Sequence, residues 1–206
     1  MNRLNTRIAP ICLVSGSVVL AASLALKPVH SAGAKEQLDQ VAAHPGAFEA
    51  STLLQILAAV LLVPGLITLA RTAAGKLGGV AIGLLYLNTL GNVGDAGHGA
   101  TLLAAAKDGV SSADVTLAKA IDAGSIASVV ELMVLIGLLG FPLLAVAFYR
   151  SGVAKWIPAV LGAAFLSFFA PINEGFGAAL MAIAFTAVAL PRRTGAPAAV
   201  PSSATA

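Results

Sequence analysis

The feature that most constrains this chain is a series of long apolar runs. The runs at about 8–26, 48–70, 77–97 and 125–149 each come close to the ~20 apolar residues that a helix needs to cross a bilayer. Only 10% of the residues are charged, against ~25% in ordinary soluble domains. So few charges cannot cover the surface of a soluble protein of this size. We therefore predict an all-α, polytopic membrane helix bundle, and we exclude a water-soluble enzyme.

The last apolar stretch, from Trp156 to Leu190, is too long for one crossing. A single helix of that length would measure about 50 Å at 1.5 Å per residue, whereas the hydrocarbon core is ~30 Å thick. Pro171 and Gly175 lie near its middle, and Pro disfavours helix at and before its own position. We expect two short helices, 156–170 and 175–190, joined by a Pro/Gly hairpin.

These two helices bring the predicted count to six spans in one transmembrane domain, residues 1–191. The remaining segment, 192–206, is rich in Ala, Pro and Ser. Such a composition cannot bury enough apolar surface to order a chain, so we expect a disordered tail.

The basic residues predict the orientation of the bundle. With six spans, eight of the 12 Lys and Arg residues lie on the side of the N-terminus, and no acid lies there. Because Lys and Arg concentrate in cytoplasmic segments, we expect both termini in the cytoplasm and the protein in a bacterial inner membrane. Segments 27–47 and 107–124 are then outer loops. The eight bases are Arg3, Arg7, Arg71, Lys76, Arg150, Lys155, Arg192 and Arg193.

The N-terminal segment has a second interpretation. Arg3 and Arg7 precede an apolar core, and Ala32-Gly33-Ala34 resembles the cleavage site of a secretory signal peptide. The apolar run at 8–26 is longer than the ~7–15 residues of a signal core. We expect an uncleaved first helix, and cleavage is the alternative.

Four polar residues follow one face of the third span. Asn88, Asn92, Asp95 and His98 are separated by steps of four, three and three, which places them on the same side of a helix. The helix rise puts Asn88 near the middle of the membrane and Asp95 near its outer boundary. This pattern favours a funnel that leads inward from the outer face. Interhelical hydrogen bonding is the structural alternative, and His98 could simply be interfacial.

Two glutamates complete the candidate site. Glu131 lies six residues into the fourth span, and no Lys or Arg is near it in sequence. A carboxyl group buried in an apolar bundle without a cation can carry a proton, so we predict Glu131 and Asp95 as the catalytic groups. The alternative is a carboxylic acid that joins two helices. Glu174, in the hairpin, is a candidate for substrate binding together with Asn88, Asn92 and His98.

Aromatic side chains of the last apolar stretch predict an apolar wall. The ring faces of Phe168 and Phe169 could stabilise a cationic intermediate, or they could simply pack. Asp95 and His98 could share a metal only with a third ligand from elsewhere, so we expect no metal and no cofactor. The chain has no basic run, which excludes a nucleic-acid partner. Gly79-xxx-Gly83 favours close helix packing, either within the fold or between copies in a homo-oligomer.

Two resemblances bear on these expectations. His44-Pro45-Gly46, followed by a span that ends in Pro-Gly-Leu-x-x-Leu-Ala-Arg at 64–71, resembles small bacterial multi-pass membrane proteins of unknown function. That resemblance covers the first five spans and implies no catalytic residues. In size and in its membrane-buried acids, the chain is also similar to the integral-membrane terpene cyclases, in which acidic groups protonate an apolar polyene or epoxide. This second likeness is one of architecture and rests on no shared motif.

Three functions agree with the sequence. The first is a membrane-embedded general acid/base enzyme of the cyclase or isomerase type, acting on an apolar isoprenoid or lipid. The second is a small proton-linked transporter or channel, in which the same carboxylates form a relay. The third is an assembly subunit whose outer loops bind a partner protein. We favour the enzyme because the acids converge at one depth without paired cations.

Overall fold

The computed structural model describes residues 3–27, 33–73, 75–107, 110–169 and 174–190. Within these ranges every regular element is a helix and no strand occurs. The predicted all-α class is therefore confirmed for the described chain. The predicted disordered tail, 192–206, and the centre of the predicted hairpin, 170–173, lie outside the described residues.

Four apolar helical segments are long enough to cross a membrane. The first three lie in α1 (Arg3–Leu26), α3 (Pro45–Thr72) and α4 (Gly75–Ala106). The fourth is Ser125–Arg150, which consists of the two helices α6 (Ser125–Leu138) and α7 (Gly140–Arg150). The break between α6 and α7 has a local cause: Pro142 has no N–H to donate to the carbonyl of Leu138. The predicted spans 48–70 and 77–97 are both shorter than the helices α3 and α4 that contain them.

Two further apolar helices are shorter. They are α8 (Trp156–Ser167) and α9 (Glu174–Ala189), close to the predicted 156–170 and 175–190. At 1.5 Å per residue, α8 is only about 18 Å long, and neither helix meets the length of a full crossing. The two helices pack on each other, and α9 also packs along α1.

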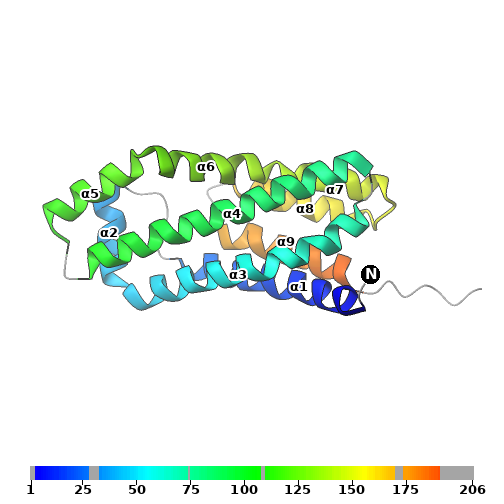
Figure 1. Cartoon of the computed structure of the whole chain (residues 1–206), viewed down its shortest axis with the longest axis horizontal. Coiled ribbons are helices and arrows are strands. Elements are labelled where there is room, and N and C mark those ends of the chain that lie inside the picture. The colour runs from blue at the N-terminus through cyan, green and yellow to red at the C-terminus, as the bar shows by residue number, and fades with distance from the viewer. Residues whose placement is uncertain (1–2, 28–32, 74, 108–109, 170–173, 191–206) are drawn as a thin grey trace, which may run out of the picture.

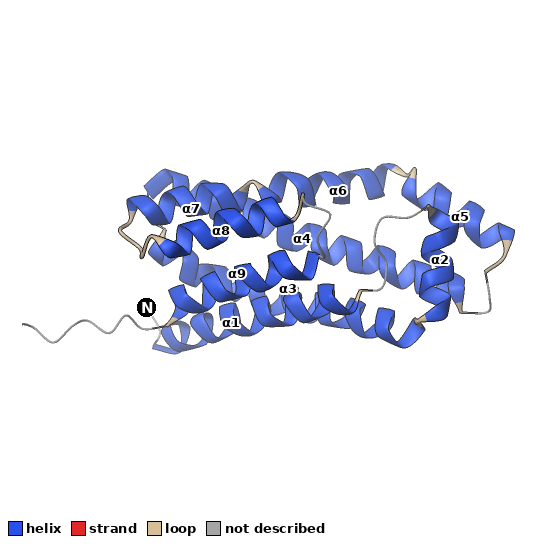
Figure 2. Ribbon diagram, turned by 180° about the vertical axis from the view of Figure 1, so that it is seen from behind, coloured by secondary structure: helices blue, strands red, loops and turns tan. Residues whose placement is uncertain are grey.

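The segments predicted as outer loops contain two helices that the sequence analysis did not predict. These helices are α2 (Ala34–Ala43) and α5 (Ser112–Asp122), and we call them the cap. They are amphipathic instead of apolar, because their buried residues share a small core with Phe48 and Leu102. Both views show the cap at one end of the bundle, with the start of α1 at the opposite end (Figures 1 and 2).

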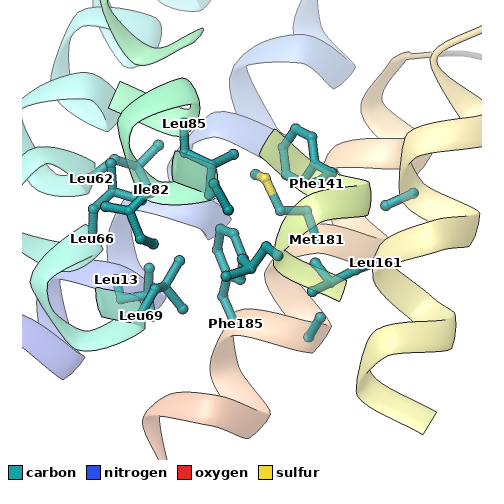
Figure 3. Packing of buried hydrophobic residues seen from close by; sticks show 14 of the residues in the cluster. Leu13, Leu62, Leu66, Leu69, Ile82, Leu85, Phe141, Leu161, Met181 and Phe185 are labelled. Atoms are coloured by element: carbon teal, nitrogen blue, oxygen red, sulfur yellow. The ribbon is translucent and has the colours of Figure 1, made fainter. Parts of the chain in front are cut away.

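The main core lies in the half of the bundle away from the cap. Leucines of α1, α3 and α4 surround Phe185 of α9, and Phe141 and Met181 lie beside it (Figure 3). Helices α1 and α3 approach closely, since a Cβ added to Gly65 would lie 2.7 Å from the Leu13 Cα. This packing makes α1 an integral part of the bundle.

Helix α6 packs mainly on α4, and glycines set the spacing. A Cβ on Gly94 would lie 2.6 Å from the Val130 side chain, and one on Gly137 would lie 2.5 Å from the Asn88 backbone. Neither α1 nor α9 packs on α6 in the described chain. In contrast, Gly79 and Gly83 of α4 have no neighbouring atoms within 4 Å of an added Cβ. Their predicted close packing therefore does not occur within the described part of one chain.

Candidate functional site

A large cavity separates α6 from α1 and α9. Its volume is about 970 Å³, and its walls come from α1, α4 and α6, with contributions from α9 and the end of α8. Cavities that hold small molecules commonly measure ~300–1,000 Å³. The cavity is therefore large enough for a long-chain ligand.

The polar face predicted on the third span lines this cavity. Asn88, Asn92, Asp95 and His98 of α4 all contribute to its wall. The helical spacing predicted that these four side chains share one side, and the structure places them together. Glu131 also lines the cavity, on the neighbouring helix α6. Both predicted catalytic carboxyl groups therefore face the same space.

Five side chains form a hydrogen-bonded network along one side of the cavity. Lys27 donates to Asp95 Oδ2 at 2.9 Å, and the Gln55 amide donates to the same oxygen at 2.9 Å. Gln55 also donates to Asn92 Oδ1 at 3.3 Å. Asn92 donates to the Asn88 side chain at 3.1 Å, and Asn88 Nδ2 donates to the Val134 carbonyl of α6. We call this set, Lys27, Asp95, Gln55, Asn92 and Asn88, the amide network.

The amide network corrects one premise of the sequence interpretation. We expected the acids to lack paired cations, but Lys27 forms an ion pair with Asp95. The two side chains are only 24% and 35% exposed, so the pair is largely shielded from water. The sequence placed Lys27 in an outer loop. It reaches Asp95 because it follows the last turn of α1, which packs along α3 beside α4.

A pair of serines aligns the helices that supply Lys27 and Gln55. Ser23 Oγ of α1 donates to the Ser51 carbonyl at 2.8 Å, and Ser51 Oγ of α3 donates to the Ser23 carbonyl at 2.9 Å. Both serines are buried. Each lies four residues before a member of the network, so the reciprocal bonds bring Lys27 and Gln55 to the same level.

His98 connects the cavity to the cap. Its Nε2 lies 3.3 Å from Asp122 Oδ1 at the end of α5. The Nδ1 atom of His98 is buried and has no hydrogen-bond partner in the described chain. His98 therefore lies at the junction between α4 and the cap, next to Asp122.

Glu131 differs from Asp95 in its surroundings. It lines the cavity, yet its side chain is exposed in the isolated chain. The expectation that the protein itself buries Glu131 was therefore wrong, because α6 packs on one side only. No cation contacts Glu131 among the described residues. The two carboxyl groups thus face the same cavity in different states of pairing.

The cavity becomes apolar toward the main core. Leu138 and Phe141, together with Phe168 and Met181, line that end. Phe168 is thus in the predicted wall. Phe169 is 63% exposed, packs edge-on against Phe165, and is not among the residues that line the cavity.

Glu174 begins α9, but its side chain lies outside the described part of the structure. The sequence analysis also overlooked three residues of the site, Lys27, Gln55 and Asp122. Gln55 offered a signal, since it is an amide in the middle of an apolar run and such residues usually bond across helices.

The described residues contain no group of three His, Cys, Asp or Glu side chains that could hold a metal ion. The chain matches no protein family, and no curated protein or solved structure is similar to it. Its function therefore has to be inferred from the geometry and chemistry of the cavity.

Proposed function

We propose that this protein is a membrane-embedded enzyme that acts on an isoprenoid or lipid substrate by general acid/base chemistry of the cyclase or isomerase type. The observation that carries the proposal is the cavity whose lining includes two carboxyl groups from neighbouring helices. Asp95 on α4 is paired with a cation, whereas Glu131 on α6 is not. Two carboxyl groups with different partners are suited to different roles in one reaction.

Glu131 is the general acid in this proposal, because it lines the cavity and no cation is paired with it among the described residues. It transfers its proton to an alkene carbon or an epoxide oxygen and becomes a carboxylate. A C–H or O–H bond forms, the alkene π bond or an epoxide C–O bond breaks, and a carbocation remains on the substrate. Loss of a proton from a carbon next to the cationic centre then forms the new double bond. The atoms balance without an oxidant or reductant, and the released proton restores the acid.

Asp95 has an electrostatic role. Lys27 and Gln55 fix its Oδ2, so a charged group stands at a defined position on the cavity wall. A preorganised charge of this kind stabilises an opposite charge that develops in the transition state. The ring of Phe168 adds a second site for a cation.

The packing below the network favours an enzyme over a proton-linked transporter. A small cavity of about 20 Å³, large enough for about one water molecule, adjoins Gln55, Asn88 and Asn92. Beyond it the main core is made of Leu, Ile and Phe side chains (Figure 3). The buried polar side chains described there, Ser17, Thr68 and Thr89, are not ionisable, so they supply no carboxyl relay across that part of the bundle.

The same proposal includes the membrane setting. The four long helical segments cross the bilayer, and the α8–α9 pair supplies two further, shorter crossings. Both termini are then cytoplasmic, in the inner membrane of a bacterial cell, and α1 is retained as a helix of the bundle. The basic turns between α3 and α4 and between α7 and α8 lie at the same end as the start of α1 (Figure 1), in agreement with the rule for cytoplasmic charges.

The test is conversion of a membrane lipid extract by the purified protein in lipid nanodiscs, followed by mass spectrometry and chromatography. We expect an isomer of one substrate to accumulate with the wild-type protein. Glu131→Gln should lower the rate at least about 100-fold, since general acids contribute ~10²–10⁴. Glu49→Gln is the matched control, because Glu49 is exposed on α3 and lies away from the cavity.

Full conversion by Glu131→Gln would overturn the assignment of the acid. Proton flux into sealed vesicles without any product would support the transporter instead. A third outcome would indicate an assembly subunit. In that case both carboxyl groups can be neutralised without loss of function, but replacing the cap with another sequence abolishes function.

A further inference from the structure

The cavity wall carries an excess of acid. Its ionisable side chains are Lys27, Asp95, His98, Asp122 and Glu131. Lys27 is the one Lys or Arg among them, and it is already paired with Asp95. His98 is close to Asp122, which leaves Glu131 with no ionic partner in the described chain. No cation on this wall therefore remains free to meet an anionic ligand.

Like charges repel each other, and the repulsion is stronger at the lower effective dielectric constant near a protein than in bulk water. A phosphate or diphosphate in this cavity would lie among carboxyl groups with no unpaired Lys or Arg to balance it. Proteins that bind such groups supply Arg or Lys for them.

Polarity also changes along the cavity. Thr101 and Asp122 lie at the end near the cap, whereas Phe141 and Met181 lie at the end near the main core. Asn88 and Thr101 are 13 positions apart on α4, which corresponds to about 20 Å along the helix. A ligand that fits this gradient has a polar end beside Asp122 and a long apolar chain that extends toward Phe141.

The route of entry agrees with such a ligand. α6 packs on α4, and it meets α5 and α7 only near its ends. In the part of the chain that the structure describes, neither α1 nor α9 has an extensive contact with α6, although residues of both line the cavity. A chain-like molecule dissolved in the bilayer can therefore enter sideways, between α6 and α9, without passing through water.

We infer that the cavity binds an uncharged, long-chain amphiphile with an oxygen-bearing polar end, such as an alcohol or an epoxide, and that it rejects the corresponding phosphate esters. The inference rests on the proposed function and narrows its substrate class. Asp122 and the lack of an unpaired Lys or Arg on the cavity wall select against the anion, and the apolar end near Phe141 receives the chain.

The experiment uses two photoreactive probes with the same C16 chain, one a primary alcohol and the other its phosphate monoester. Each probe is added to the full-length protein in nanodiscs and irradiated, and the labelled residues are located by mass spectrometry. We expect the alcohol to label α6 and α9 residues of the cavity at least tenfold more than the phosphate does. Leu135→Trp should reduce that labelling, because exposed Leu135 lines the cavity. Leu132→Trp is its control, since Leu132 is similarly exposed on α6 but does not line the cavity.

Charge variants complete the test. The variant Asp122→Asn should raise labelling by the phosphate, and Glu49→Gln should leave it unchanged. Equal labelling by both probes in the wild-type protein would overturn the inferred ligand class. Labelling outside the cavity alone, unaffected by Leu135→Trp, would overturn the binding site. Because photolabelling requires no turnover, these outcomes are separate from the conversion assay, which tests the acid chemistry.

Discussion

At the scale of single residues, the ion pair between Lys27 and Asp95 defines the site. Its Nζ–Oδ2 distance is 2.9 Å, and both side chains are mostly shielded. Removing one partner leaves an unpaired charge inside the bundle, which is costly. We predict that Lys27→Met and Asp95→Asn each lower the unfolding free energy. The double variant should show a coupling energy of about 1 kcal/mol, measured by denaturant titration in micelles.

The chain contains a matched control for this measurement. Lys35 and Asp39 form an ion pair within α2, with side chains that are 71% and 48% exposed. Exposed pairs at this helical spacing contribute ~0.3–0.5 kcal/mol. A coupling for Lys27 and Asp95 that does not exceed the coupling for Lys35 and Asp39 would contradict a structural role for the buried pair.

The sequence predicted one wall of the site better than the contacts across it. The spacing of Asn88, Asn92 and Asp95 depends only on the geometry of one helix, so it could be read directly. The bonds from Lys27 and Gln55 depend on how α1, α3 and α4 are arranged, and a single sequence does not contain that arrangement. For the same reason the sequence could not show that Asp95 has a cation and Glu131 has none.

At the scale of elements, glycine controls the contact of α4 with α6. A Cβ at Gly137 would lie 2.5–2.6 Å from backbone and Cβ atoms of Asn88, and backbone cannot move aside as a side chain can. We predict that Gly137→Ala destabilises the protein by about 1–3 kcal/mol, as overpacking usually does, and separates α6 from the amide network. The measurement is the melting temperature in detergent.

The control for this prediction is Gly97→Ala on the exposed side of α4, where an added Cβ meets nothing within 4 Å. Ala favours helix over Gly, so this variant should melt at the same or a higher temperature. If Gly137→Ala also melts at the wild-type temperature, the spacing of α4 and α6 does not depend on glycine.

The stability of the first turn of helix α5 depends on pH. Ser111 and Asp114 form a capping box, and the hydrogen bonds from Ser111 lower the pKa of the Asp114 carboxyl from its usual 3.8. A lowered pKa means that the carboxylate stabilises α5 above pH 3.8, and that this contribution is lost as the pH falls through the lowered value. We predict that at pH 3 the Val115 amide exchanges hydrogen faster than the intrinsic pH dependence of amide exchange would explain. In Ser111→Ala the Val115 amide should exchange faster already at pH 7. If its exchange rate depends on pH as in the wild-type protein, the capping box does not stabilise α5.

The cap was missed because its helices are neither long nor apolar. Hydropathy finds segments that can replace water with lipid, and α2 and α5 instead bury a narrow stripe against Phe48 and Leu102. A signal was nevertheless present in the sequence. Ser111 followed three residues later by Asp114 is a variant of the pattern that begins helices.

At the scale of the whole molecule, the number of crossings depends on α8 and α9. Each is shorter than the ~30 Å core of a bilayer, so the pair either crosses with its turn at the outer boundary or enters and returns within the inner half. In both arrangements Trp156 and Leu190 lie on the same side. The decisive position is the turn, and Phe169, 63% exposed at its start, reports on it.

We predict six crossings, and single cysteines in a Cys12→Ser background test this number. In intact spheroplasts, a membrane-impermeant maleimide should label Ser112→Cys in the cap, and should label Phe169→Cys more slowly because that position lies below the cap. It should label Lys76→Cys and Ala154→Cys only after permeabilisation, since both lie in the basic turns at the other end. Labelling of Phe169→Cys only after permeabilisation would mean that α8 and α9 enter and leave on the cytoplasmic side. The cavity would then lose a transmembrane wall at Phe168 and Met181, and its apolar end would face the inner half of the bilayer.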